Sequence, residues 1–197
     1  ITAQAQTVYR VDRVLGPGTV KGTITVDNNA IPGPIGPEDI ISWSFETNDG
    51  LSDPPPAHGP IVISSTGVGG MEGNAWAYLS ATESALLFDF DGAFNDPIAY
   101  GIGFNDGGDG FAITYGLAGF ENGKLEQLVH FFDDPTLGSQ AHYVEAIQTA
   151  TGPVVIGTAE PVLVTRAELP RRFEALDLSS IVNSDLGGTA FGTIFPA

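Results

Sequence analysis

A turn rich in glycine and acidic residues, Asn105-Asp106-Gly107-Gly108-Asp109-Gly110, is the first candidate for chemistry in this sequence. Calcium binds carboxylate and carbonyl oxygens at about 2.4 Å, and glycines let backbone carbonyls point into a loop. We therefore predict Asn105, Asp106 and Asp109 as calcium ligands. The spacing differs from an EF-hand loop, which needs Gly at position six and Glu at position twelve. The alternative is a tight solvated turn, in which backbone conformation alone favours Asn, Asp and Gly.

A second acidic group follows an apolar run, and its members are Asp89, Asp91, Asn95 and Asp96. On one face of a strand, Asp89 and Asp91 would lie about 7 Å apart, close enough to share a calcium ion with a third ligand such as Asp96. The alternative is a solvent-facing strand edge whose charges discourage aggregation.

Aromatic side chains offer a platform for a sugar, because the apolar face of a pyranose stacks on a ring while its hydroxyls meet polar neighbours. The candidates are Trp43, Trp76, Tyr78, Tyr100, Tyr115 and Tyr143. Trp43 alternates with Ile41 and Phe45 on a predicted strand, so we expect all three on one side of a sheet, facing the core. Trp76 and Tyr78 share a face of another predicted strand, from Ala75 to Leu79, and are predicted as ligand-binding residues. Core packing is the alternative for them too.

Catalytic motifs are missing from the sequence. The histidines are His58, His130 and His142, and none belongs to a Gly-x-Ser-x-Gly or His-Glu-x-x-His arrangement. His130 could reach Asp133 or Asp134 locally, but no serine accompanies them. Glu121 and Glu126 flank a turn, yet the Glu-x-Asp-x-x-Glu strand motif of sandwich glycosidases is absent. We therefore expect no enzymatic activity, and keep an extracellular hydrolase with an unrecognised site as an alternative.

Composition restricts the partners. The 197 residues contain 7 basic and 24 acidic side chains, a net charge of −17, and no cysteine. Nucleic acid and anionic membrane surfaces need clustered Lys and Arg, so neither is an expected partner. No apolar stretch is long enough to span a membrane. The sequence begins at Ile1 rather than Met, and we expect export by a removed leader.

Short apolar runs punctuated by 26 glycines and 14 prolines predict many strands and turns. Thr19–Asp27 has β-branched residues at nearly every other position, which is typical of a strand. Phe111–Phe120 and Lys124–Phe132 are predicted to form a hairpin around Asn122-Gly123. Ser84–Asp91 is predicted as one more strand, and Gln140–Thr149 fits either a helix or a strand.

The pattern predicts an all-β fold, an antiparallel β-sandwich or jelly-roll with at most one or two short helices. No linker divides the sequence, so a single domain over residues 1–197 is expected. The segment Ile1–Leu15 is predicted to pair with a sheet, which could belong to a neighbouring copy of the chain.

Three pieces of sequence resemble a known family: GTITVD (22–27), DIISWSF (39–45) and LSATESALLFDFDG (79–92). Their order and spacing are similar to the extracellular domain of bacterial PEP-CTERM sorting proteins, in which strands of the types GTITxD, DIxxWxx and TxxxLLFDF recur. The resemblance covers roughly residues 19–104. It implies export and a surface or matrix location rather than a particular chemistry. The family's sorting tail, with its Pro-Glu-Pro motif, is missing from this sequence.

These observations predict a secreted or cell-surface structural, matrix or adhesive protein that self-assembles through strand pairing. The first alternative is a carbohydrate-binding module, dependent on calcium, whose partner is extracellular polysaccharide. The second is the extracellular hydrolase.

Overall fold

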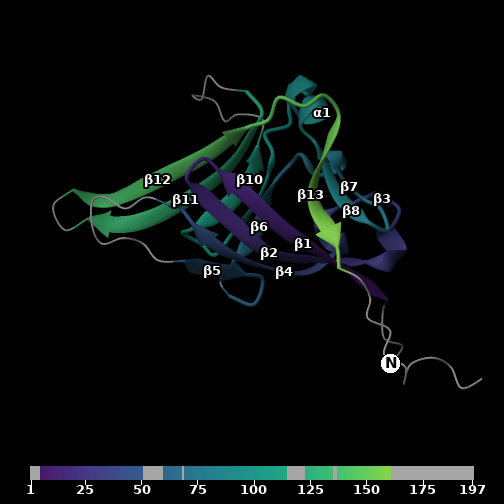
Figure 1. Cartoon of the computed structure of the whole chain (residues 1–197), viewed down its shortest axis with the longest axis horizontal. Helices are drawn as coiled ribbons and strands as arrows, with labels where there is room; N and C mark the ends of the chain where they lie inside the picture. Colours follow the sequence, from purple (N-terminus) through teal and green to yellow (C-terminus); the bar gives the residue numbers. More distant parts are fainter. Residues whose placement is uncertain (1–4, 51–59, 68, 115–122, 135–136, 161–197) are drawn as a thin grey trace, which may run out of the picture. The chain divides into compact units, whose positions relative to one another are not determined.

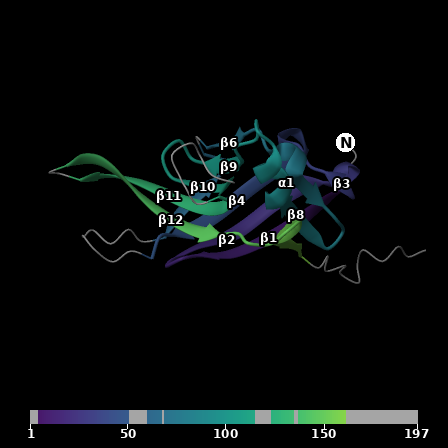
Figure 2. The ribbon, with the colours of Figure 1, turned by 90° about the horizontal axis from the view of Figure 1, so that it is seen from above.

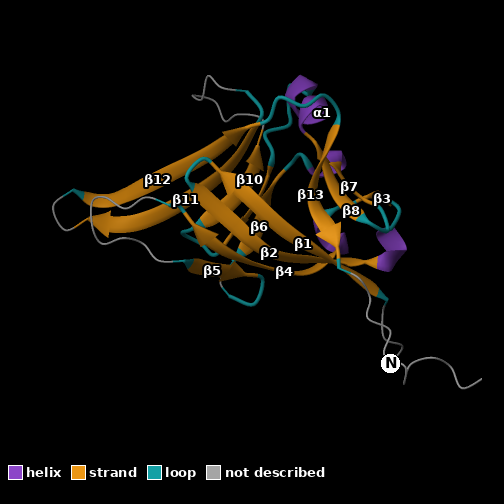
Figure 3. Cartoon of the chain, viewed as in Figure 1, coloured by secondary structure: helices purple, strands orange, loops and turns teal. Residues whose placement is uncertain are grey.

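The computed structural model describes residues 5–50, 60–67, 69–114, 123–134 and 137–160. These residues form two antiparallel sheets that face each other (Figure 1), and strands dominate over helices (Figure 3). The prediction of an all-β sandwich with few short helices is confirmed. Residues up to Glu160 form one compact unit. The unit Pro161–Ala197 lies outside the described residues, so a single domain over the whole chain stays a prediction.

The larger sheet has eight strands. Their order is β3 (Gly33–Pro34), β7 (Leu79–Ala81), β8 (Ala85–Asp89), β13 (Pro153–Ala159), β1 (Gln6–Leu15), β2 (Gly18–Asp27), β4 (Ile40–Asn48) and β5 (Ile61–Ser64). The smaller sheet has five strands. Their order is β12 (Gly138–Ile147), β11 (Leu125–Asp134), β10 (Gly110–Thr114), β9 (Ile102–Asn105) and β6 (Gly70–Gly73). The helical elements are α1 (Phe90–Asn95) and the 3₁₀ turns η1 (Asn28–Ala30), η2 (Pro37–Asp39) and η3 (Trp76–Tyr78).

Strand β1 lies inside the larger sheet of its own chain. It pairs with β2 from Gln6 to Leu15, and with β13 at Tyr9 and Arg10. Gly16 begins the two-residue loop with φ +57°, a conformation that glycine adopts without steric cost. Residues 6–15 thus pair within the sheet of their own chain, and pairing of this segment with a neighbouring copy stays a prediction.

The two sheets lie one over the other (Figure 2), and their buried hydrophobic residues form one core cluster. Trp43 and Phe45 of β4 meet Phe104 of β9 with ring centroids 5.4 and 5.3 Å away, and Phe45 also meets Phe111 of β10 at 5.6 Å. These edge-to-face contacts stabilise by about 0.5–1.5 kcal/mol each beyond the area that they bury. The aromatic cluster thus packs the inner face of the smaller sheet against the inner face of the larger one.

The predicted placement of Trp43 and Phe45 is confirmed, but that of Ile41 is wrong. A β-bulge shifts the pairing of β2 with β4, so that Thr25 lies opposite Ser42 while Val26 lies opposite Ile40. Since one residue of shift reverses the face that a side chain takes, Ile40 is buried and Ile41 is exposed.

The hairpin predicted around Asn122-Gly123 is confirmed in its pairing. Strands β10 and β11 are antiparallel neighbours, with Thr114 opposite Leu125. Most of the turn itself, residues 115–122, lies outside the described part of the chain. Among the helices described, none is long and apolar enough to cross a membrane.

Candidate functional site

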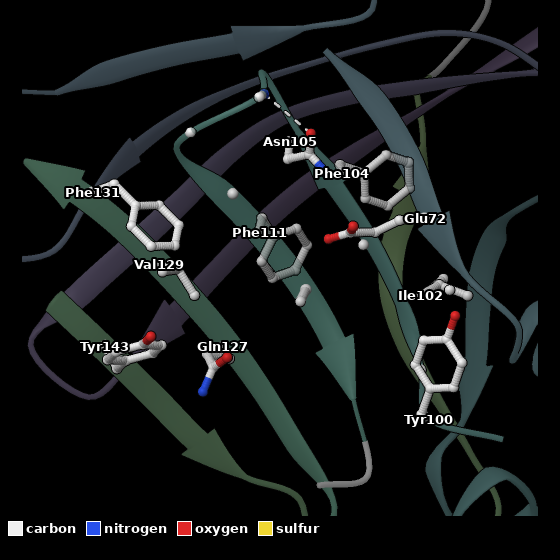
Figure 4. A pocket seen from close by; sticks show the side chains of 17 residues that line it. Glu72, Tyr100, Ile102, Phe104, Asn105, Phe111, Gln127, Val129, Phe131 and Tyr143 are labelled. Carbon is white, nitrogen blue, oxygen red and sulfur yellow. Dashed lines mark hydrogen bonds between the residues drawn. The ribbon is translucent and has the colours of Figure 1, made fainter. Parts of the chain in front are cut away.

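A groove of about 540 Å³ opens on the outer face of the five-stranded sheet (Figure 4). Alternate residues of a strand point to opposite faces. Strands β9 and β10 therefore send Phe104 and Phe111 into the core, and present Gly103 and Ala112 to the groove. Gly110 extends this floor of small residues. Because these floor residues have small side chains or none, the outer face of the sheet is concave at its middle strands.

Exposed aromatic rings flank the floor. Phe131 of β11 is 54% exposed and Tyr143 of β12 is 50% exposed, while Tyr100, before β9, is 47% exposed on the opposite side (Figure 4). Val129 lies directly opposite Tyr143 in the ladder, so its methyl groups continue the wall between the two rings. The arrangement presents apolar faces on both sides of a shallow trough.

Polar groups of the groove come from three strands. Gln127 of β11 donates through Nε2 to Oε1 of Glu145 at 2.6 Å, and the Asn105 side chain accepts from the backbone N–H of Gly107 at 3.1 Å. Glu72 of β6 extends over the floor (Figure 4). Among the described residues that line the groove, none is Lys, Arg or His. The site is therefore apolar at its walls, and the one charged side chain among its described lining residues is the carboxylate of Glu72.

The turn predicted to bind calcium lies at one end of this groove. Oδ1 of Asp106 accepts from the backbone N–H groups of Gly108 and Asp109 at 3.2 and 2.9 Å. Oδ1 of Asp109 accepts from the backbone N–H of Phe131 at 2.9 Å, which ties the turn to β11. Asn105, Asp106 and Asp109 thus cap backbone donors, as in the solvated-turn alternative. Within the described ranges, no three His, Asp or Glu side chains are placed to hold a metal ion, and calcium stays a prediction.

The second acidic group is arranged differently from the prediction. Strand β8 ends at Asp89, whose Oδ1 caps α1 by accepting from the backbone N–H groups of Asp91 and Gly92 at 3.1 and 2.9 Å. Asp91 is thereby carried onto the helix, where it pairs with Lys124 at 3.2 Å. The expectation that Asp89 and Asp91 share one strand face is wrong, because an N-cap aspartate starts a helix here.

Asp96 accepts from the backbone N–H of Ile98 at 3.1 Å and from the Tyr78 hydroxyl at 2.8 Å. The Ile98 bond, followed by the Tyr78 bond, lowers the pKa of Asp96 below its ordinary value. The same hydroxyl–carboxylate bond raises the pKa of Tyr78. Asp96 is therefore a local anchor for the loop after α1.

The predicted ligand-binding pair lies outside the groove. Trp76 and Tyr78 belong to the 3₁₀ turn η3 rather than to the predicted strand. The Trp76 indole donates from Nε1 to the carbonyl of Gly73 at 3.1 Å, and its ring packs edge-on against Phe104 at 6.2 Å. Of the wider set of aromatic candidates, Tyr100 and Tyr143 line the groove. Phe131 is not among the residues predicted from the sequence, although its alternation with Val129 in β11 indicates that the two share a face.

A buried polar cluster joins the two sheets beneath the groove wall. Oδ2 of Asp49 lies 3.4 Å from Nδ1 of His130 and 3.3 Å from Nδ1 of His142, which are partners across β11 and β12. Nε2 of His130 lies 3.1 Å from the hydroxyl of Thr47. Thr47, Asp49 and His130 are buried. The order Thr47, His130, Asp49 resembles that of a nucleophile, a base and an acid. The Thr47 hydroxyl is fully buried, however, and donates to the Ile61 carbonyl at 3.2 Å. The cluster therefore serves the packing of the two sheets.

Glu126, considered above as a glycosidase residue, is buried in an ion pair. Its two oxygens accept from Nε and Nη2 of Arg13 at 2.8 and 2.6 Å, and Gln148 donates to Oε2 at 2.6 Å. Arg13 belongs to the larger sheet and Glu126 to the smaller one. This carboxylate holds the sandwich together and is closed to a substrate, while Glu121 lies outside the described residues.

Comparisons of the chain with protein-family models, with curated proteins and with solved structures found no match.

Proposed function

We propose that this protein binds a saccharide chain in the groove on the outer face of the five-stranded sheet. The observation that carries the proposal is the pair of aromatic walls, Phe131 and Tyr143 on one side and Tyr100 on the other, around a floor of small residues. The apolar face of a sugar ring stacks on such side chains, and a floor without large side chains lets the ring approach the sheet. The volume of about 540 Å³ lies within the range of ligand sites.

Polar groups between the walls supply partners for sugar hydroxyls. The carboxylate of Glu72 accepts hydrogen bonds, and the amides of Gln127 and Asn105 both accept and donate. Gln127 is held in place by its bond to Glu145, which reduces the entropy lost when a ligand binds. A few fixed polar groups within a mostly apolar site favour specific binding over non-specific adhesion.

The arrangement favours binding over hydrolysis. Glycosidases place two carboxyl groups about 5–10 Å apart. Glu72 and Glu145 face the groove side of the sheet from its two edge strands, β6 and β12. Four strand spacings, about 19 Å, separate these strands along the sheet. This is too far for the two carboxyl groups to act on one glycosidic bond.

The resemblance to PEP-CTERM extracellular domains supports an exported location, in which extracellular polysaccharide is an available ligand. Self-assembly through strand pairing stays a separate prediction.

Isothermal titration calorimetry tests the proposal, with hexasaccharides of β-1,4-linked glucose, xylose, mannose and N-acetylglucosamine as probes. We expect at least one probe to bind, and Tyr143→Ala and Phe131→Ala each to weaken that binding by about 10-fold, equivalent to about 1.4 kcal/mol. Phe94→Ala is the matched control, because Phe94 is similarly exposed but does not line the groove. Equal losses in all three variants, or no binding of any probe at millimolar concentration, would contradict the proposal.

A further inference from the structure

Glu72 lies above the floor of the groove, opposite a glycine that leaves space for its side chain. In the pairing of β6 with β9, Glu72 lies across from Gly103. A Cβ atom at position 103 would lie 3.2 Å from both Cγ and Oε1 of Glu72. The missing Cβ gives the glutamate side chain room to lie across β9, and a Cβ there would displace it by a few tenths of an ångström. Figure 4 shows its carboxylate directed from the edge strand over the floor.

The Glu72 carboxylate has no hydrogen bond or ion pair with any residue of the described part of the chain, and its side chain is exposed. Other acidic groups around the smaller sheet differ. Asp109 accepts from a backbone N–H, Asp91 pairs with Lys124, and Glu126 binds Arg13. The oxygens of Glu72 are therefore available to donors that a ligand brings.

Among the described residues, no Lys or Arg lines the groove around Glu72. The described basic residues Arg10, Arg13 and Lys21 belong to β1 and β2 of the larger sheet, and Lys124 is paired with Asp91. The whole chain carries a net charge of −17. A ligand with carboxylates or sulfates would meet repulsion from the carboxylate in the groove and from the protein as a whole.

We propose that Glu72 is a specificity residue that makes the groove select saccharides bearing a protonated amine over neutral ones, and that anionic saccharides are excluded. The inference rests on the proposed saccharide binding. An ammonium donates charge-assisted hydrogen bonds to the carboxylate, which are roughly twice as strong as those from a neutral hydroxyl. The aromatic walls supply binding that all saccharides share, and Glu72 adds the part that depends on charge.

Calorimetric titrations at pH 5.5, where an amine of ordinary pKa is protonated, compare three probes. These are hexamers of β-1,4-linked glucosamine, of N-acetylglucosamine and of galacturonate. The wild-type protein is expected to bind the glucosamine hexamer about 10-fold more tightly than the acetylated one, and not to bind the galacturonate hexamer. Glu72→Gln keeps the size of the side chain and removes its charge. It should abolish the preference while changing the affinity for the acetylated hexamer less than about threefold.

Glu46→Gln is the control, because it makes the same change of net charge at an exposed position on the outer face of the larger sheet. It should preserve the preference for the amine. If Glu46→Gln reduces the preference as much as Glu72→Gln does, or if Glu72→Gln retains it, the role of Glu72 is overturned. If this inference alone fails, the acetylated hexamer still binds in a way that depends on Tyr143, but the glucosamine hexamer binds no more tightly than the acetylated one. If no hexamer binds, both the inference and the proposed function are overturned.

Discussion

The ion pair between Arg13 and Glu126 links the two sheets and gives a direct test of what holds the sandwich together. The Glu126 side chain is 1% exposed and receives three short hydrogen bonds, two of them from the guanidinium. The Arg13 side chain is 23% exposed, so it retains some access to water. The two single substitutions are therefore expected to differ in cost.

Arg13→Ala leaves a buried carboxylate with the Gln148 amide as its remaining described donor. Removing one partner of a buried ion pair costs about 3–5 kcal/mol, because the other charge stays desolvated. Glu126→Gln leaves a guanidinium that can turn toward solvent, so we expect a loss of about 2 kcal/mol, close to that of one hydrogen bond to a charged group. In the double variant no buried charge is left alone. Its loss of unfolding free energy should therefore be smaller than the sum of the two single losses by at least about 1.5 kcal/mol.

Urea unfolding followed by far-ultraviolet circular dichroism measures these free energies. Lys124→Ala is the control, because its partner Asp91 is 40% exposed and such pairs contribute about 1 kcal/mol or less. A loss for Arg13→Ala no greater than for Lys124→Ala, or strict additivity in the double variant, would refute the reasoning. The sheets would then be held by the aromatic core without help from this pair.

Three further predictions concern the core, the buried polar cluster and the loop after α1. Phe45→Ala should lower the free energy of unfolding by about 3–5 kcal/mol in urea denaturation, because the ring is fully buried among Trp43, Phe104 and Phe111. Asp49→Asn should cost about 1–3 kcal/mol in the same assay, because the carboxylate that faces His130 and His142 loses its charge; an unchanged unfolding midpoint would count against that role. The pKa of Asp96 is lowered in the folded state, first by the backbone N–H of Ile98. The ionised carboxylate therefore stabilises the fold. This contribution is complete above the ordinary aspartate pKa of about 3.9, and it is lost as the pH falls through the lower pKa of the folded state. Asp96→Asn should remove this part of the acid dependence when thermal midpoints are compared between pH 5 and pH 2.5, and identical pH profiles for both proteins would contradict it.

Local pattern was sufficient for the strands that carry their own signal. The alternation in Thr19–Asp27 predicted β2, and Asn122-Gly123 predicted the pairing of β10 with β11. Gln140–Thr149 was ambiguous because its apolar residues fit both periods. The segment forms strand β12 because its backbone pairs with β11, with Leu125 opposite Ile147. That pairing is a tertiary effect which no local window contains.

The errors share a physical cause, since each depends on where a strand stops or slips. The bulge beside Ser42 reverses the face of Ile41, and the N-cap at Asp89 ends β8 and moves Asp91 onto a helix. Tryptophan is a residue type that strands favour, but Trp76 begins a 3₁₀ turn, and its indole N–H donates to the carbonyl of Gly73. Single hydrogen bonds thus override the alternation of residue types.

The groove could be predicted only in part, because it depends on residues from five strands. Tyr100 and Tyr143 belong to the aromatic set seen in the sequence, yet nothing in their spacing indicates that they flank one trough. Gly103 and Glu72 are far apart in the chain, and the space that the glycine leaves is visible only when β6 and β9 are paired. The cluster of Asp49, His130 and His142 was missed for the same reason.

Backbone amide chemical shifts measured by NMR during titration with the glucosamine and N-acetylglucosamine hexamers test the central claim most directly. Saturable shift changes should concentrate on the floor and walls of the groove, at Gly103, Ala112, Gln127, Phe131 and Tyr143. The outer face of the larger sheet, including Lys21 and Glu46, should stay unchanged. Shifts confined to that other face, or spectra that neither saccharide alters at millimolar concentration, would contradict the account.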